Sequence, residues 1–462
     1  MWPRILYLFC IFFSLKVSAI TIEEFSSELL KSHPYFLQQT LSEKVSIIDQ
    51  KDALVYSDWT IQAGASESYA SGEDQSSKLY DDRYITGYEV SAAKKYPDTG
   101  GSLTLGHSWN ITDTDVGSVN TNLNSNSFSL DYTRPLRQNK GGLNDRLAAD
   151  IATIDSQSKQ ISLQEQSENY LASKLKKFID LAHAHEKEKL YRDQLELSKE
   201  QLSLAEKKFN QSLIEKTALL QEQDSYTRAD QQWLQSRLDL ANLQQELSAL
   251  IGMSKNNMTV ELDLFERQVI TQIDAANFVT KSRILQQLDF DKLKLKRQLV
   301  TYKDKNKANV NLTMGIASQG EHNKFFKSLS NRDYSWNVGV NVSYPINPVK
   351  ESLDIQRAEI NISQIDAHKS EKVIDIEQQI SFLVSQINLL DELMSINVKQ
   401  VQLANQKIAE EAIKYKEARG QKSLLISAQK NANQALLSSL QTATNYQKTI
   451  IDYRATIDQL LD

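Results

Sequence analysis

The stretch YSWNVGVNVSY, residues 334–344, alternates strictly between two kinds of side chain. Tyrosine, tryptophan and valine occupy the even positions, while serine, asparagine and glycine occupy the odd ones. Because successive side chains of a strand point to opposite faces, this strand has one apolar face and one small polar face. Such a pair of faces, with aromatic residues near the strand ends, is typical of a membrane barrel that surrounds water.

The same alternation recurs in Trp59–Ala65, Leu103–Ile111, Phe128–Tyr132 and Val310–Ile316. A soluble β-sandwich also alternates in this way. However, a sandwich does not explain two sets of strands inserted between very long helices of an exported protein. We therefore predict an antiparallel β-barrel within an α+β membrane protein.

The very long helices are indicated by the absence of glycine and proline. Leu143–Ile251 contains neither residue, and Val349–Asp462 contains only Gly420. Apolar residues in these stretches recur every seven positions, which predicts helices packed as coiled coils. The three rows are Tyr226, Trp233, Leu240 and Leu247; Ile380, Ile387, Met394, Val401, Ile408 and Tyr415; and Leu436, Ala443, Ile450 and Ile457. The helices alone also fit a filamentous coiled coil.

The N-terminus has the features of a secretory signal. Arg4 precedes an apolar run, Ile5–Leu15, and Val17-Ser18-Ala19 provides small residues for cleavage. This run of about eleven helical residues reaches only about 16 Å, roughly half of a bilayer core, so a signal anchor is the weaker alternative. We expect residues 1–19 to be removed and the mature chain to be exported without a helical anchor.

The overall composition excludes several classes of protein. The 462 residues are 40% hydrophobic and 24% charged, which is too polar for a membrane protein with many helical spans. Removing Arg4 and Lys16 with the signal changes the formal net charge from −6 to −8, which argues against nucleic-acid binding. The single cysteine, Cys10, lies in the signal, so thiol, disulfide and zinc-thiolate chemistry are excluded for the mature chain.

The chain contains an internal repeat with an offset of 206 residues. Lys208-Phe209 and Lys216–Leu219 recur as Lys414-Tyr415 and Lys422–Leu425. A period near 200 residues exceeds that of solenoid repeats, so a unit of strands and helices is duplicated.

The repeat divides the mature chain into two parts, each with one long helical hairpin. The first part, residues 20–265, has a short helix, strands at about 59–134 and a hairpin at about 143–251 that turns near 209–216. The second part, residues 266–462, has a helix at about 272–307, strands at about 309–344 and a hairpin at about 351–461 that turns near 415–422.

Four motifs occur in a definite order along the chain. They are Ser32-His33-Pro34, Arg134-Pro135-Leu136 followed by Gly141-Gly142, Leu247–Gly252, and Tyr415–Gln429. Each is weak alone, but in this order and at these spacings they are specific. Over essentially its whole mature length, the chain resembles the TolC-like outer-membrane efflux family.

The resemblance implies a homotrimer that forms one tube. Its strands would make a single shared barrel in the outer-membrane lipid, and its helices would make a periplasmic tunnel that narrows at the tip. Such a tube is a passive exit duct for small molecules or polypeptides delivered by an inner-membrane transporter and a periplasmic adaptor. No enzyme activity, cofactor or metal is expected. Drug efflux and type I protein secretion stay open, and a periplasmic coiled-coil adaptor or structural protein is the alternative from another class.

The resemblance also places the gate and the adaptor contact at the periplasmic tip. The assigned residues are Ser212, Lys216, Ala418, Arg419, Gly420, Lys422, Leu424 and Ser427. Ser212 and Ala418 stand where relatives have the tip glycine, and Gly420 is displaced by two positions. Relatives can have acids where this chain has Leu424 and Ser427, so we expect a small, apolar constriction among basic residues. A solvated helix end without a gating role is the alternative.

The strand regions lead to three further expectations. The turns between strands and helices are assigned to Pro135, Gly141, Gly142, Pro345 and Pro348. Family members usually contribute four strands to a twelve-stranded barrel, whereas Tyr84–Ala92 and Ser102–Ile111 add an alternating pair, so we expect about six. This pair belongs either to the barrel wall or to a side hairpin. The polar segments Asp113–Asn126 and Gln319–Asp333 are predicted to be long loops facing the exterior.

Two motifs that resemble catalytic or metal sites are interpreted as structural. Asp98-Thr99-Gly100 matches an aspartic-protease triplet, but its position after Tyr96-Pro97 is typical of a tight turn. His183-Ala184-His185 places its imidazoles about 200° apart on a helix, so they cannot share a metal ion, and we expect a solvated face.

Overall fold

The computed structural model describes residues 19–72, 79–253, 260–270, 278–344, 346 and 348–461. These residues fall into two compact units. The first comprises the residues up to Leu41, Ser162–Leu285 and the residues from Lys372 onward. The second comprises Ser42–Ile161 and Gln286–Glu371, so each unit contains parts of both predicted repeats.

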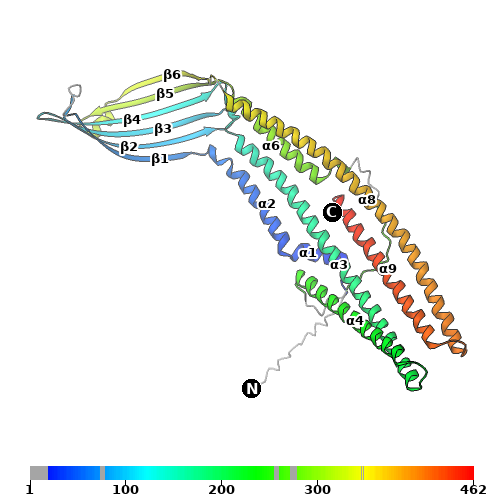
Figure 1. Ribbon diagram of the computed structural model, residues 1–462. Coiled ribbons are helices and arrows are strands. Elements are labelled where there is room, and N and C mark those ends of the chain that lie inside the picture. Colours follow the sequence, from blue (N-terminus) through cyan, green and yellow to red (C-terminus); the bar gives the residue numbers. More distant parts are fainter. Residues whose placement is uncertain are drawn as a thin grey trace, which may run out of the picture. The chain divides into compact units, whose positions relative to one another are not determined.

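The second unit contains one sheet of six strands (Figure 1). They are β1 (Thr60–Ser71), β2 (Asp82–Tyr96), β3 (Gly101–Val116), β4 (Val119–Pro135), β5 (Asn309–His322) and β6 (Asp333–Ser343). Their order in the sheet follows the sequence, and each strand pairs antiparallel with the next. The expected count of six is confirmed. The additional pair, β2 and β3, lies inside the sheet between β1 and β4, so it is not a side hairpin.

The register separates apolar from polar side chains across all six strands. One line of paired residues crosses the apolar face: Ile61, Ala92, Leu105, Leu130, Ile316 and Trp336. The adjacent line on the polar face is Gln62, Ser91, Gly106, Ser129, Ala317 and Ser335. The apolar face is open in the single chain, where Ile61 is 73% and Trp336 is 78% exposed.

The segment Asp113–Asn126 is not a long loop, and this prediction was wrong. β3 continues to Val116 and β4 begins at Val119, so Gly117 and Ser118 alone form the connection. Gly117 has a φ of 61°, as two-residue hairpin turns require. The polar residues pair across the strands instead of forming a loop; Asn122, for example, donates to Asp113 at 2.6 Å.

The segment Gln319–Asp333 is also more ordered than predicted. β5 extends to His322, and a short helix, α7 (Phe325–Ser330), precedes β6. Helix α7 packs on the apolar face, where the Phe325 ring lies 4.5 Å from the Trp109 ring and Asn126 donates to Ser328 at 2.5 Å. This contact buries Asn126 completely and so removes an amide from the apolar surface.

The helices of the two long hairpins are α3 (Leu147–Asn210), α4 (Lys216–Leu250), α8 (Val349–Lys416) and α9 (Lys422–Thr456). The shorter helices are α1 (Ile22–Ser32), α2 (Pro34–Asp52), α6 (Arg283–Lys305) and the single turns η1 (Val55–Ser57) and η2 (Lys140–Gly142). Within the described ranges, no helix combines the length and the apolar composition that crossing a bilayer requires.

Polar contacts give the order of the four long helices in the first unit. Trp233 of α4 donates to Glu188 of α3 at 2.8 Å, and His183 of α3 lies 2.8 Å from the Thr444 hydroxyl of α9. Asn397 of α8 donates to Thr442 of α9 at 2.9 Å. The helices are therefore joined in the order α4, α3, α9 and α8. Predicted seam residues are buried on both α8 and α9; examples are Ile380, Ile387, Ala443 and Ile450.

Two predicted helices have different bounds in the structure. The first short helix is two helices, because His33, the residue before Pro34, adopts an extended conformation that ends α1, and Pro34 begins α2. The helix predicted from about residue 272 is interrupted, because residues 278–279 are helical, a turn follows, and α6 begins at Arg283, whose backbone N–H donates to the Asp458 carboxylate at 3.0 Å. Residues 271–277 lie outside the described part of the chain.

Candidate functional site

The turn between α3 and α4, residues 211–215, ends the first long hairpin. Leu213 N–H donates to the Lys208 carbonyl, and Ser212 N–H donates to the Phe209 carbonyl, both at 2.8 Å. Together these bonds form the Schellman motif, which ends a helix with one residue in the left-handed conformation. That residue is Ser212, with a φ of 57°.

The turn between α8 and α9, residues 417–421, repeats this geometry 206 residues later. Arg419 N–H donates to Lys414 at 2.9 Å, Ala418 N–H donates to Tyr415 at 3.1 Å, and Ala418 has a φ of 57°. Both positions assigned to the tip glycine of relatives thus adopt the conformation that favours glycine. Gly420 is favoured for a different reason, which is lack of space. A Cβ at this position would lie 3.0 Å from the Lys414 Cβ.

The far ends of the two hairpins show the same offset. Gly252 after α4 and Asp458 after α9 are 206 residues apart and have φ values of 67° and 58°. Met253 N–H donates to Ser248 and Gln459 N–H donates to Arg454, both at 2.9 Å. The matching helix ends support the predicted duplication.

We expect Ser212→Gly and Ala418→Gly each to stabilise the folded protein by about 0.5–1 kcal/mol, because each relieves a non-glycine residue of a left-handed conformation. The midpoint of thermal unfolding should rise in both variants. Gly252→Ala is the matched control, since no atom lies within 4 Å of the added Cβ and only the backbone conformation changes. It should lower the midpoint by a similar amount, and unchanged midpoints in all three variants would contradict this interpretation.

The basic residues of the two turns are only partly neutralised. Lys422 donates to Glu200 of α3 at 2.9 Å, and this hydrogen bond raises the pKa of Lys422. Arg419 pairs with Glu417, and Lys414 pairs with Glu411 at 3.0 Å. In the part of the chain that the structure describes, no ion pair forms at the other four lysines of the turns, Lys207, Lys208, Lys216 and Lys416, and all four are exposed.

The positions expected to form the constriction lie at the start of α9. Leu424 is 53% exposed and Ser427 is also exposed, whereas Leu425 and Ile426 between them are buried. The helix therefore presents Leu424 and Ser427 away from the packing of the chain, where a second molecule or the solvent can reach them.

The turn from β4 into α3 contains three of the assigned residues. Pro135 ends β4, and Gly141 and Gly142 have φ values of 69° and 67°. A Cβ at Gly142 would overlap the Pro97 carbonyl oxygen in the β2–β3 turn, so this position requires glycine. Of the second set, Pro348 directly precedes α8, and Pro345 lies outside the described residues.

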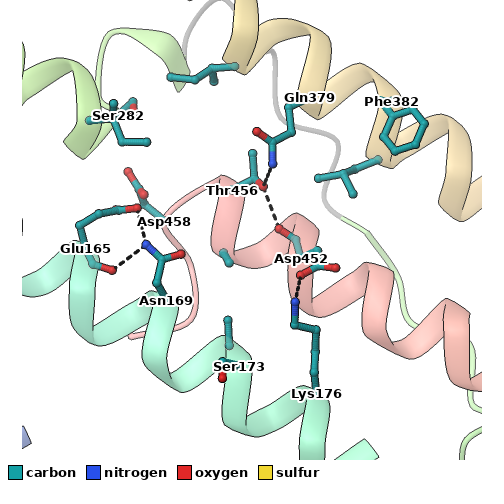
Figure 2. A pocket seen from close by; sticks show the side chains of 15 residues that line it. Glu165, Asn169, Ser173, Lys176, Ser282, Gln379, Phe382, Asp452, Thr456 and Asp458 are labelled. Carbon is teal, nitrogen blue, oxygen red and sulfur yellow. Dashed lines mark hydrogen bonds and ion pairs between the residues drawn. The ribbon is translucent and has the colours of Figure 1, made fainter. Parts of the chain in front are cut away.

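A hollow of about 630 Å³ opens in the first unit and is lined by α3, α8 and α9 (Figure 2). Lys176 donates to Asp452 at 2.6 Å, and Gln379 of α8 donates to the Thr456 hydroxyl at 3.3 Å. These pairs hold the helices together across the hollow. Its charged groups are engaged with one another, as in a structural contact.

Three carboxylates near this hollow surround one arginine. Arg283, at the start of α6, forms ion pairs with Glu165, Glu168 and Asp458. Glu168 is only 1% exposed, and burial raises the pKa of Glu165. Because the guanidinium occupies the centre of the carboxylates, the cluster joins α3, α6 and the end of α9. The sequence pattern did not indicate this cluster, because its members lie far apart along the chain.

The two motifs with possible chemistry have structural roles. Thr99 and Gly100 N–H both donate to the Tyr96 carbonyl, at 3.2 and 2.8 Å, which confirms the tight turn. The expectation of a solvated His183 was wrong, because this residue is partly buried against Thr444, and burial lowers its pKa. His185 is exposed and lies 3.4 Å from Glu186, so the two imidazoles contact different groups.

No protein-family model and no curated protein sequence matches the chain. Solved structures do match it over almost the whole length. The outer-membrane channel OprN aligns with a TM-score of 0.68 and 14% identity, covering 95% of this chain and 90% of that one. The chain has the fold of an outer-membrane channel. The Campylobacter jejuni CmeC outer membrane channel aligns with a TM-score of 0.69 and 12% identity over 96% and 87% of the two chains.

A third outer-membrane channel shares this fold. The Neisseria gonorrhoeae MtrE channel aligns with a TM-score of 0.65 and 11% identity over 95% of this chain and 88% of that one. The predicted resemblance is therefore confirmed at the level of the fold. These three structures are outer-membrane channels, and the similarity of this chain to them is a similarity of fold.

Proposed function

We propose that three copies of this chain form an outer-membrane channel that continues as a helical tunnel into the periplasm. It is a passive exit duct for cargo delivered by an inner-membrane transporter and a periplasmic adaptor. The observation that carries this proposal is the six-stranded sheet with one apolar and one small polar face, in a chain with the fold of outer-membrane channels. A periplasmic adaptor or a structural coiled coil does not require a sheet with one apolar and one small polar face.

An apolar stripe on α8 supports assembly with further copies. Phe382, Leu389, Ile396 and Leu403 recur every seven residues and are 58–66% exposed. They lie about 200° around the helix from the buried seam Ile380, Ile387 and Met394 that packs within the chain. A helix with apolar residues on two opposite sides requires two partners, and one chain supplies only one of them.

The periplasmic gate belongs to the same proposal. The two turns, with Ser212, Ala418 and the start of α9, meet their counterparts from the other copies around one opening. Leu424 and Ser427 form the constriction, and closure depends on packing and on hydrogen bonds between turns. Adaptor contact uses the exposed basic residues of the turns, of which Lys216 is one.

The cargo is either small molecules or polypeptides, and both reach the same duct from different partners. Neighbouring genes, or capture of the transporter with the intact channel, distinguish drug efflux from type I secretion. The duct itself hydrolyses nothing, so energy comes from the transporter.

Cysteine labelling on whole cells tests the location of the two ends of the channel. Ser118 lies in the exposed β3–β4 turn, and Ser212 lies in the exposed α3–α4 turn. With the signal removed, the mature chain has no other cysteine. We expect Ser118→Cys to react with an impermeant maleimide on intact cells, and Ser212→Cys to react only after the outer membrane is permeabilised. The reverse pattern would contradict the proposed orientation.

A further inference from the structure

The two edges of the sheet are unprotected in the single chain. Eleven of the twelve residues of β1 are exposed, and ten of the eleven residues of β6 are exposed. Neither strand contains proline or lysine, the residues with which soluble proteins protect sheet edges. Among the described residues, no further strand pairs with the outer side of β1 or of β6, so backbone groups at each edge must be satisfied by another strand inside a membrane.

The two edges are complementary to each other. Five antiparallel pairings separate β1 from β6, so the two strands run in opposite directions and can pair antiparallel between neighbouring copies. Their lengths match at twelve and eleven residues. The apolar face also continues across the junction, because Ile61, Ala63 and Ala65 on β1 would adjoin Val338, Val340 and Val342 on β6.

We propose that the barrel formed by three copies has eighteen strands rather than the twelve that the family resemblance implies, and that its lumen accepts polypeptides that keep secondary structure. This inference rests on the proposed function for the number of copies. Each copy contributes its six strands, because β2 and β3 are internal to the sheet and pair with β1 and β4 along their length. Without neighbouring copies, the barrel has no closed wall.

The larger number of strands widens the lumen. With strands about 4.8 Å apart and tilted by about 40°, eighteen strands give a backbone diameter of about 35 Å, against about 24 Å for twelve. Allowing about 5 Å for side chains on each side leaves about 25 Å and 14 Å. A single helix of about 10 Å fits both lumens, whereas a helical hairpin of about 20 Å fits only the wider one.

The residues on the polar face keep this lumen open. The residues facing it are mostly small, such as Gly106, Ser129 and Ala317. The β5–β6 connection does not fill it either, because α7 packs on the opposite, apolar face through Trp109 and Asn126. The side chains of the sheet and α7 therefore leave the barrel lumen open.

Labelling with maleimide-polyethylene glycols of increasing size measures the lumen in the intact channel. Thr313 lies on the polar face near the start of β5, so a reagent entering from the cell surface must pass along most of the barrel to reach a Thr313→Cys variant. We expect labelling by polymers up to about 25 Å in diameter. A cutoff near 14 Å would overturn the eighteen-stranded barrel. Ser118→Cys is the control, since every polymer should reach it from outside.

A second variant lacks β2 and β3. Because β1 and β4 run in opposite directions, deleting Asp82–Val116 leaves a four-stranded antiparallel sheet. If this variant assembles, its cutoff at Thr313→Cys should fall from about 25 to about 14 Å; an unchanged cutoff would contradict the inference. If this variant does not assemble, the size cutoff for labelling of Thr313→Cys in the full-length channel alone tests the inference. Failure of Ser118→Cys to label from outside would instead contradict the proposed function.

Discussion

Replacing two residues of the α8 stripe, Phe382→Asp with Leu389→Asp, should prevent the chains from assembling into the trimer and leave folded single chains. The two side chains are 64% and 59% exposed in one chain, so their loss costs little in its own folding. Each interface between copies would lose the burial of a phenylalanine and a leucine, about 3–6 kcal/mol, and would gain two charges that must be desolvated. Analytical ultracentrifugation in mild detergent measures the mass, and circular dichroism measures the remaining helix.

Ser381→Asp with Asn388→Asp is the matched control. These positions are exposed, lie on the same helix at the same spacing, and are about 100° away from the stripe. This variant should remain a trimer. A trimeric stripe variant, or dissociation of both variants, would show that the stripe is not the interface.

Placing acids at the constriction, Leu424→Asp with Ser427→Asp, should create strong block by multivalent cations. A trimer would then have six carboxylates around one opening, where low-dielectric walls strengthen the field. Oxygen ligands of this number bind divalent cations tightly, so the blocking concentration should fall by about 100-fold or more relative to wild type. Conductance of reconstituted channels, with cations added on the side of the turns, measures the effect.

Leu424→Asn with Ser427→Asn separates charge from shape, because the amides have nearly the same size as the acids. Multivalent cations should block this variant as poorly as they block the wild-type channel. The account of the gate would be wrong if wild type were already blocked by micromolar cations from that side, since its constriction is predicted to have no acid.

The strand pattern was enough to predict the sheet, because side-chain alternation directly reports the two faces of a strand. The same pattern identified β2 and β3 as strands, but it did not show whether they join the sheet. That question depends on pairing between distant residues, such as Ala92 with Leu105 and Leu105 with Leu130. The polar composition of Asp113–Asn126 led to the wrong prediction of a long loop, because its Asn and Thr residues pair across strands instead.

The tip could be predicted only in part. The repeat placed Ser212 and Ala418 at equivalent positions, and both adopt the left-handed conformation expected of a tip glycine. The partners of the charged residues were not predictable, because they come from helices far apart in the sequence. Lys422 pairs with Glu200, and Arg283 lies among Glu165, Glu168 and Asp458.

Electrophoresis of the purified, unheated protein on a denaturing gel tests the shared channel most directly. A barrel closed by β1–β6 pairing between copies resists detergent until it is heated, because its backbone hydrogen bonds connect the chains into one wall. We expect a band at about three times the chain mass that collapses to the single chain on boiling. A single-chain band alone, from protein extracted and kept in mild detergent, would contradict the proposed trimeric channel.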